Sequence, residues 1–166
     1  MRNVYTNGYC TSSSDLNAHR TMLNNVREAL ATVLKEYDAT TIAVRGTSGL
    51  SIAYELRALS LYRGHPMLPF AMVRKDDGHH GGPVESLDFT TMSIGRYIIL
   101  DDFISSGKTV AAIMDKMECM MDPDVKCQAI VLYEEMHRDT WALYKKETPG
   151  SFKKADGTLV QVAIYK

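Results

Sequence analysis

The sequence predicts a single α/β domain in which a central parallel sheet is flanked by helices. Short apolar segments typical of buried strands alternate along the chain with segments whose apolar residues recur at helical spacing. The chain has 166 residues, 45% of them hydrophobic, which is enough for one domain with a real core but not for a second. We therefore expect residues 1–166 to form one domain.

The first half of the chain predicts two helices and two strands. Apolar residues at helical spacing behind the Ser-Ser-Ser-Asp cluster at 12–15, which can supply an N-cap, predict a helix over about 16–37. Residues 41–44 are typical of a short buried strand, and 68–73 of the next strand. Between them, a second helix is predicted from its inner face, formed by Ile52, Ala53, Leu56 and Leu59.

The second half continues the alternation and then departs from it. Residues 97–100 and 129–133 are typical of buried strands, and the helix predicted between them has a core-like stripe of Val110, Ile113, Met114, Met117 and Met121. Residues 141–146 look helical. The Asp156-Gly157 pair separates two short segments, 151–153 and 159–164, which predicts a hairpin.

The most informative segment of the chain runs from the strand at 97–100 into residues 101–109. Asp101 and Asp102 leave the strand and are followed by a loop of small residues that opens a helix. Backbone N–H groups at a helix N-terminus bind phosphate, whereas adjacent carboxylates suit a pair of vicinal hydroxyls. The segment therefore predicts a sugar-phosphate site. A nucleoside-triphosphate P-loop would need glycine at position 102, where a carboxylate would repel phosphate.

A second small-residue segment, Arg45-Gly46-Thr47-Ser48-Gly49, follows the strand at 41–44 and precedes a helix. Parallel strands place it at the same edge of the sheet as the first loop. It offers backbone donors, a helix N-terminus and a fixed cation, which together suit a group such as pyrophosphate. The alternative for this segment is an ordinary turn.

A third segment, residues 74–82, is rich in glycine and histidine and has no apolar anchor. It begins with Arg74 and Lys75 and contains His79 and His80. We expect a mobile lid. Its cations would neutralise an anionic leaving group such as pyrophosphate, and its closure would exclude water from the reacting atoms. Two alternatives stay open, a solvated hairpin tip and a metal site at the histidines, although zinc would need further ligands.

The block over 97–109 resembles the PRPP-binding signature of type I phosphoribosyltransferases: a hydrophobic strand, two acidic residues, three variable residues, Ser or Thr, Gly, any residue, Ser or Thr. The resemblance covers about residues 40–135 and implies that family's fold, with a small variable hood over the nucleobase at 138–166. It further implies that Asp101 and Asp102 bind the ribose hydroxyls of PRPP. The residues implied to bind its 5-phosphate are Ser105, Ser106, Gly107, Lys108 and Thr109.

The same resemblance implies the remaining roles. Pyrophosphate would be bound by Arg45, Gly46, Thr47, Arg74 and Lys75, and covered or protonated by His79 or His80. Mg²⁺ would be the cofactor, reached by Asp101 and Asp102 directly or through water. The family also implies a homodimer. The segment at 74–82 is partly similar to the flexible loop of orotate phosphoribosyltransferases, but a second lysine is missing and the spacing is broken.

The resemblance implies a Mg-PRPP-dependent enzyme that attaches a nucleobase to ribose 5-phosphate and releases pyrophosphate. Family members that act on 6-oxopurines commonly have Asp where Ser105 stands, which favours an orotate-like pyrimidine or an adenine-like base. Two alternatives stay open: a non-catalytic regulator that senses PRPP or nucleotides, and an enzyme that uses ribose phosphates without PRPP.

Composition excludes several other classes of protein. The net charge of −1 and the absence of a Lys/Arg cluster argue against nucleic-acid binding. The three cysteines, Cys10, Cys119 and Cys127, lack paired spacing, so reduced thiols in a cytoplasmic protein are expected. The chain shows neither a secretory leader nor an apolar run of membrane-spanning length.

Overall fold

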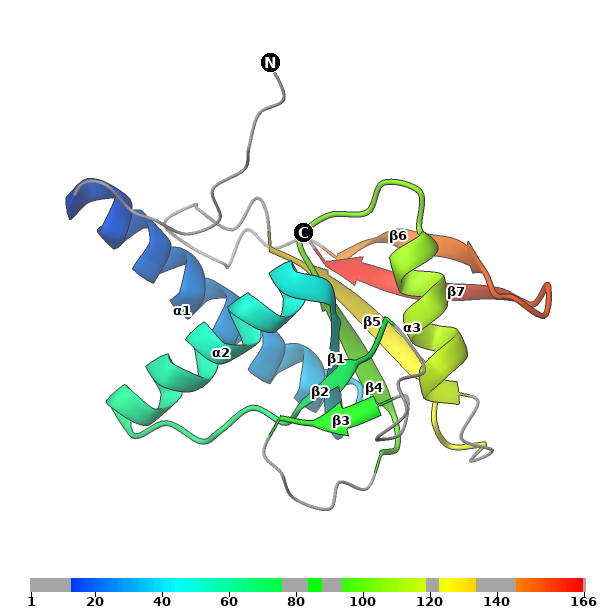
Figure 1. Ribbon diagram of the computed structural model, residues 1–166, viewed down its shortest axis with the longest axis horizontal. Helices are drawn as coiled ribbons and strands as arrows, with labels where there is room; N and C mark the ends of the chain where they lie inside the picture. The colour runs from blue at the N-terminus through cyan, green and yellow to red at the C-terminus, as the bar shows by residue number, and fades with distance from the viewer. Residues whose placement is uncertain (1–12, 76–83, 88–93, 119–122, 134–145, 166) are drawn as a thin grey trace.

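A seven-stranded sheet forms the centre of the molecule (Figure 1). The structure, a computed structural model, describes residues 13–75, 84–87, 94–118, 123–133 and 146–165. The strands are β1 (Thr41–Arg45), β2 (Phe70–Val73), β3 (Val84–Ser86), β4 (Tyr97–Asp101), β5 (Cys127–Leu132), β6 (Lys146–Lys153) and β7 (Leu159–Tyr165). Their order is β3-β2-β1-β4-β5-β7-β6. Five of them run parallel, and β3 and β6 are antiparallel strands at the two edges.

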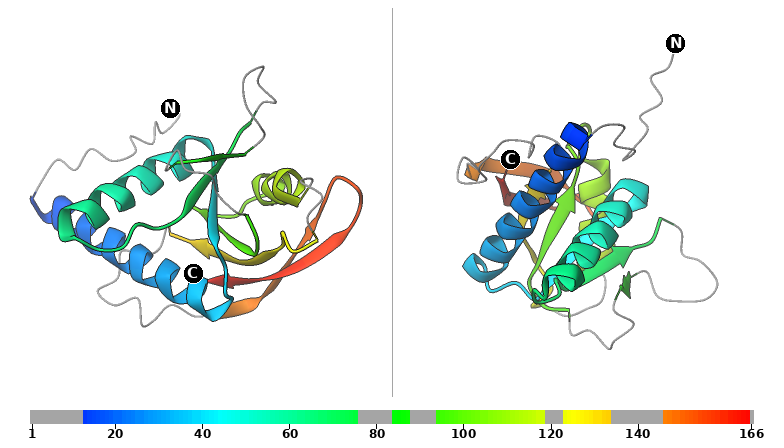
Figure 2. Two further views of the ribbon diagram at one scale, coloured as in Figure 1. Left: turned by 90° about the horizontal axis from the view of Figure 1, so that it is seen from below. Right: turned by 90° about the vertical axis from the view of Figure 1, so that its left-hand side faces the viewer.

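Within the described residues, three helices cover the two faces of this sheet (Figure 2). α1 (Ser13–Glu36) and α2 (Gly46–Arg63) pack on one face, and α3 (Lys108–Glu118) packs on the other. Successive side chains along a strand point to opposite faces of the sheet, so each central strand contributes to both core layers. Ile98 and Leu100 of β4 pack with α1 and α2, whereas Tyr97 and Ile99 pack with α3. Because both faces are covered, the central strands consist mostly of apolar residues, as the sequence pattern indicated.

The predicted α/β architecture is confirmed, and the differences are local. α1 begins at Ser13 and α3 ends at Glu118, so Met121 lies outside the described residues. Val110, Ile113, Met114 and Met117 are buried, which confirms the predicted core stripe. β3 was not predicted. It has three residues that are all half-buried, too short and too polar to show period-2 alternation.

The second helix begins earlier than its apolar face suggested. α2 starts at Gly46, so most of the predicted loop at 45–49 is in fact the first turn of this helix. Gly46 has φ 76°, a conformation that favours glycine. Gly49 lets the helix approach β1, because a Cβ atom there would lie 3.2 Å from Cβ of Val44. Small residues at this junction therefore permit close packing of helix on strand.

The predicted C-terminal hairpin is confirmed, but it joins the main sheet. β7 pairs in parallel with β5, and β6 pairs with β7 in antiparallel register. Asp156 and Gly157 form the turn, where the Thr158 N–H donates to Oδ1 of Asp156 at 2.8 Å. Lys146, predicted as helical, belongs to β6, because pairing with Tyr165 of β7 takes precedence over local helix propensity. Of the predicted hood, 138–145 lies outside the described residues, and its action as a base cover stays a prediction.

Glu118, the last residue of α3, ties the hairpin to the sheet and helix. Its Oε1 accepts from the Tyr97 hydroxyl at 3.0 Å and from the Cys127 N–H at 3.3 Å, and its Oε2 accepts from Nζ of Lys154 at 2.8 Å. Burial raises the pKa of the Tyr97 hydroxyl, which therefore remains a hydrogen-bond donor. One carboxylate thus joins β4, β5 and the end of β6.

We expect Glu118→Ala to destabilise the protein by about 2–4 kcal/mol, since it leaves three partly or fully buried donors without their acceptor. Asp115→Ala is the matched control, because Asp115 accepts only the exposed Ala155 N–H among the hydrogen bonds described for it, at 3.1 Å. It should cost about 1 kcal/mol or less. Urea unfolding of both variants measures the difference, and equal losses would contradict a special role for Glu118.

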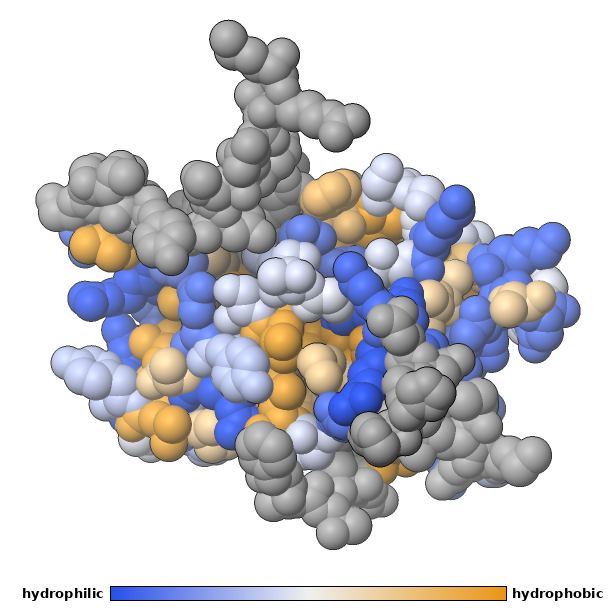
Figure 3. Space-filling model, viewed as in Figure 1, coloured by the Kyte–Doolittle hydropathy of each residue, from blue (hydrophilic) through white to orange (hydrophobic). Residues whose placement is uncertain are grey.

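The surface carries hydrophobic side chains in several separate places on the face shown in Figure 3. The exposed large hydrophobic residues include Leu16, Leu61 and Tyr62 on α1 and α2. Within the described part of the chain, no helix combines the length and the apolar character needed to span a membrane.

Candidate functional site

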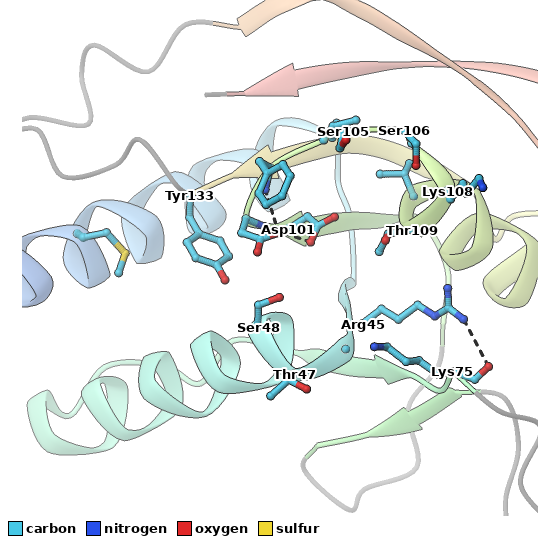
Figure 4. Close-up of a pocket in the computed structure, with 17 residues that line it drawn as sticks. Arg45, Thr47, Ser48, Lys75, Asp101, Ser105, Ser106, Lys108, Thr109 and Tyr133 are labelled. Carbon is cyan, nitrogen blue, oxygen red and sulfur yellow. Dashed lines mark hydrogen bonds between the residues drawn. The ribbon is translucent and has the colours of Figure 1, made fainter. Parts of the chain in front are cut away.

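A cavity of about 950 Å³ opens where the carboxyl ends of β1 and β4 meet the first turns of α2 and α3. Figure 4 shows the side chains around it, with α2 on one side and the β4–α3 connection on the other. Parallel strands place their carboxyl ends at one edge, which is where α/β proteins bind ligands. The cavity brings together most of the predicted site residues: Arg45, Gly46, Thr47, Lys75, Asp101, Asp102, Ser105, Ser106, Gly107, Lys108 and Thr109.

Asp101 and Asp102 stand at the centre of the cavity wall. Asp101 is the last residue of β4 and is only 6% exposed, whereas Asp102 is half-buried. The Asp102 N–H donates to Oδ1 of Asp101 at 3.1 Å, and the Phe103 N–H donates to Oδ1 of Asp102 at 3.0 Å. These local bonds fix both carboxylates while leaving acceptor capacity for a ligand with hydroxyl groups.

Burial raises the pKa of Asp101 to about 7, and the neighbouring Asp102 adds to the effect. Burial also raises the pKa of Tyr133, with further contributions from the carboxylates of Asp102 and Asp101, and a hydrogen bond with Ser48 acts in the opposite direction. The two carboxylates therefore create a region of negative charge that reaches Tyr133. A ligand with hydroxyl or N–H donors, or a divalent cation, would relieve it.

The raised pKa of Asp101 predicts a stability that depends on pH. The carboxyl has its ordinary pKa near 3.8 when the chain is unfolded, so between about pH 4 and pH 7 the folded state holds the extra proton and loses stability as the pH rises. Asp101→Asn should therefore stabilise the unliganded protein by about 2–4 kcal/mol at pH 8 and by little at pH 4. Urea unfolding at the two pH values tests this, and a gain that does not grow with pH would contradict it.

The predicted phosphate segment lies between β4 and the first turn of α3. The Gly107 carbonyl accepts the Ala111 N–H at 3.0 Å, so Gly107 is the N-cap residue directly before α3. No acidic residue lies in the first turn of α3, which leaves its N-terminus free for an anion. Gly107 has φ 72°, and a Cβ atom there would lie 3.2 Å from Cδ1 of Phe152. The buried Phe152 of β6 therefore supports this segment from behind, and only glycine suits the position.

The predicted pyrophosphate segment lies at the opposite side of the cavity. Its Arg45 is the N-cap residue of α2 but makes no side-chain cap bond, and the first turn of α2 contains no acidic residue. Nε of Arg45 is buried without a hydrogen-bond partner, while its Nη2 donates to the Lys75 carbonyl at 3.5 Å. Lys75 lies over the helix start, since a Cβ atom at Gly46 would be 3.3 Å from its Cε and 3.6 Å from its Nζ. The side chains of Arg45 and Lys75 thus lie close to the N-terminus of α2 at this side of the cavity.

Not every predicted residue joins this site. Arg74 forms an ion pair with Glu85 of β3 and does not line the cavity. The antiparallel pairing of β3 with β2 brings these two charges together, and sequence reasoning missed it because β3 was not foreseen. His79 and His80 lie outside the described residues, so their part in a lid stays a prediction.

Six lining residues had no individual role assigned from the sequence: Ser48, Phe103 and Ile104, which lie within the predicted segments, and Met22, Val110 and Tyr133, which lie outside them. Tyr133 directly follows β5, and its N–H donates to the Asp101 carbonyl at 3.1 Å. Its position at the carboxyl end of a parallel strand next to β4 was a signal that sequence reasoning could have used. Met22 comes from α1, and nothing in its local sequence distinguishes it from the other core residues of that helix.

The arrangement suits magnesium bound together with a substrate. The described residues contain no group of three or more His, Cys, Asp or Glu side chains placed to share a metal ion. Asp101 and Asp102 alone would not form a full coordination shell, but Mg²⁺ typically keeps several waters and takes one or two carboxylates plus substrate oxygens. These two residues therefore fit a metal that arrives with a phosphorylated ligand.

Comparisons with known proteins identify the fold. No protein-family model matches the sequence, and no curated protein sequence matches it. Among solved structures, the chain is similar to orotate phosphoribosyltransferase from Francisella tularensis, with TM-score 0.53 and 13% identity over 74% of this chain and 52% of that one. It is also similar to orotate phosphoribosyltransferase from Aeropyrum pernix (TM-score 0.47, 18% identity, 72% and 60% covered) and to adenine phosphoribosyltransferase from Thermoanaerobacter pseudethanolicus (TM-score 0.44, 18% identity, 74% and 76% covered).

The chain thus spans about half the length of the orotate enzyme with the highest of these three TM-scores. At such identities the likeness concerns the fold, and the choice of base does not follow from it. The sheet and the flanking helices agree with that likeness. The chain has the type I phosphoribosyltransferase fold.

Proposed function

We propose that this protein is a Mg-PRPP-dependent phosphoribosyltransferase that attaches a nucleobase to ribose 5-phosphate and releases pyrophosphate. The observation that carries the proposal is that the starts of α2 and α3, neither with an acidic residue in its first turn, face each other across one cavity that Asp101 and Asp102 also line. Such a cavity matches a ligand that has phosphate groups at both ends and a sugar in the middle. Of the bases, an orotate-like pyrimidine or an adenine-like base is favoured over the 6-oxopurines.

Each group of residues has a role in this proposal. The N–H groups of residues 105–109 bind the 5-phosphate, and the carboxylates of Asp101 and Asp102 accept hydrogen bonds from the ribose hydroxyls. Arg45, Lys75 and the start of α2 at Gly46 and Thr47 hold the pyrophosphate and stabilise the charge that develops as its bond to C1 breaks. Mg²⁺, when bound with PRPP, would neutralise part of the pyrophosphate charge. A cytoplasmic homodimer stays a prediction from the family resemblance.

Incubation with Mg²⁺, PRPP and single bases tests the proposal, with released pyrophosphate as the readout. The panel is orotate, uracil, adenine, hypoxanthine, guanine, xanthine and nicotinate. We expect base-dependent release with at least one of them, and none with Mg²⁺ or PRPP omitted. Binding of PRPP without release with any base would favour a regulator, and failure to bind PRPP would overturn the proposal.

A further inference from the structure

Charge is unevenly distributed along the cavity. Among the described lining residues, the cations are Arg45, Lys75 and Lys108, and they lie together at one end in Figure 4. At the other end, Tyr133 and Ser48 lie close to Asp101. The cavity therefore has a cationic end and an end, formed by Tyr133, Ser48, Asp101 and Asp102, that carries hydroxyls and carboxylates.

The nucleobase has to occupy the second of these ends if the proposed function holds. Pyrophosphate takes the end with Arg45 and Lys75, and the ribose lies on Asp101 and Asp102. A displacement at C1 forms the new bond on the face opposite the departing group, so the base approaches from the side away from the cations. The lining residues labelled there in Figure 4 are Tyr133 and Ser48.

These residues suit a flat ring with hydrogen-bond donors. Tyr133 offers an aromatic surface for packing. The carboxylates accept N–H donors, and the Ser48 and Tyr133 hydroxyls can donate or accept. A base that itself carries a carboxylate would bring a third negative charge to Asp101 and Asp102, with no cation of the described lining residues at that end.

We infer that the base site selects an uncharged nucleobase, such as adenine or uracil, and discriminates against an anionic base such as orotate, with Tyr133 and Ser48 as specificity-determining residues. This inference rests on the proposed function and narrows its substrate class. Serine at position 105 favoured both an orotate-like pyrimidine and an adenine-like base, and the inference decides between them.

Binding of nucleoside monophosphates tests the inference without requiring turnover. Uridine and orotidine 5′-monophosphates differ only in the carboxylate on the ring, so the ratio of their dissociation constants isolates that charge. Calorimetry on the full chain should show uridine monophosphate binding at least about tenfold more tightly than orotidine monophosphate. Adenosine monophosphate should also bind more tightly. Equal or tighter binding of orotidine monophosphate would overturn the inference.

A charge introduced at the site provides a second test. Tyr133→Arg should bring the ratio of the dissociation constants of the uridine and orotidine nucleotides close to one. If this variant folds poorly, Ser48→Arg introduces the same charge from α2 and should have the same effect. Tyr54→Arg is the matched control, because Tyr54 is half exposed on α2 and does not line the cavity. It should leave the ratio unchanged. An unchanged ratio in both site variants, each folded, would contradict the assignment of these residues.

Sugar-phosphate binding separates failure of the inference from failure of the proposed function. If ribose 5-phosphate and PRPP bind but orotidine monophosphate is preferred, the inference is wrong and the function stands. If the sugar phosphates bind and none of the three nucleotides does, the base site is wrongly placed. If no sugar phosphate or nucleotide binds, the proposed function fails together with the inference.

Discussion

Replacement of both Asp101 and Asp102 by asparagine is expected to abolish binding of Mg-PRPP while leaving the fold intact. Both carboxylates line the cavity, and each would accept a charge-assisted hydrogen bond from a ribose hydroxyl. Loss of two such bonds corresponds to roughly 1.5–3 kcal/mol each, or a decrease in affinity of more than a hundredfold. Calorimetric titration with Mg-PRPP measures it.

The same double variant should be as stable as the natural protein or more so. Asp101 and Asp102 repel each other and Asp101 is buried, so removing their charge relieves an unfavourable interaction. Asp124→Asn, at an exposed carboxylate remote from the cavity, is the control and should bind normally. Affinity within threefold of the natural protein would overturn the ribose assignment. A large loss of stability would instead show that the carboxylates are structural.

The sequence predicted the parallel core because its signals are local. Apolar strands buried on both faces and helices with one apolar stripe are visible residue by residue, and both core layers contain the residues that those patterns indicated. The Asp-Asp segment was equally visible, since strand, carboxylates and small residues follow one another directly in the chain. Its position at the cavity follows from parallel topology alone.

The features that sequence reasoning missed depend on contacts between distant segments. Glu85 lies 11 residues from Arg74, and only the pairing of β2 with β3 makes them partners. Tyr133 reaches the cavity because β5 lies beside β4, and Met22 because α1 packs on the same face of the sheet as α2. The parallel contact of β7 with β5 likewise joins the hairpin to the sheet. No local pattern specifies such pairings.

Lys75→Ala is expected to lower the rate of pyrophosphate release by about a hundredfold or more with an active base, while PRPP affinity changes much less. Lys75 lies beyond the end of β2, with its Cε and Nζ near Gly46 at the start of α2, so in the proposed function its charge would face the leaving group rather than the ribose. Its effect should therefore be largest in the transition state, where negative charge on the pyrophosphate increases. Initial rates at saturating PRPP measure this effect.

The affinity for ribose 5-phosphate shows whether Lys75 acts only at the pyrophosphate end of the cavity. The ligand lacks pyrophosphate, so its affinity should be the same in Lys75→Ala and in the natural protein, within about twofold. Lys126→Ala is the matched control, because Lys126 is exposed before β5 and does not line the cavity. It should change neither rate nor affinity. If Lys75→Ala weakens ribose 5-phosphate and PRPP equally, the lysine supports the whole cavity and does not act on the leaving group. An unaltered rate would remove Lys75 from the pyrophosphate site, leaving Arg45 as the one described cation placed at the start of α2 to act there.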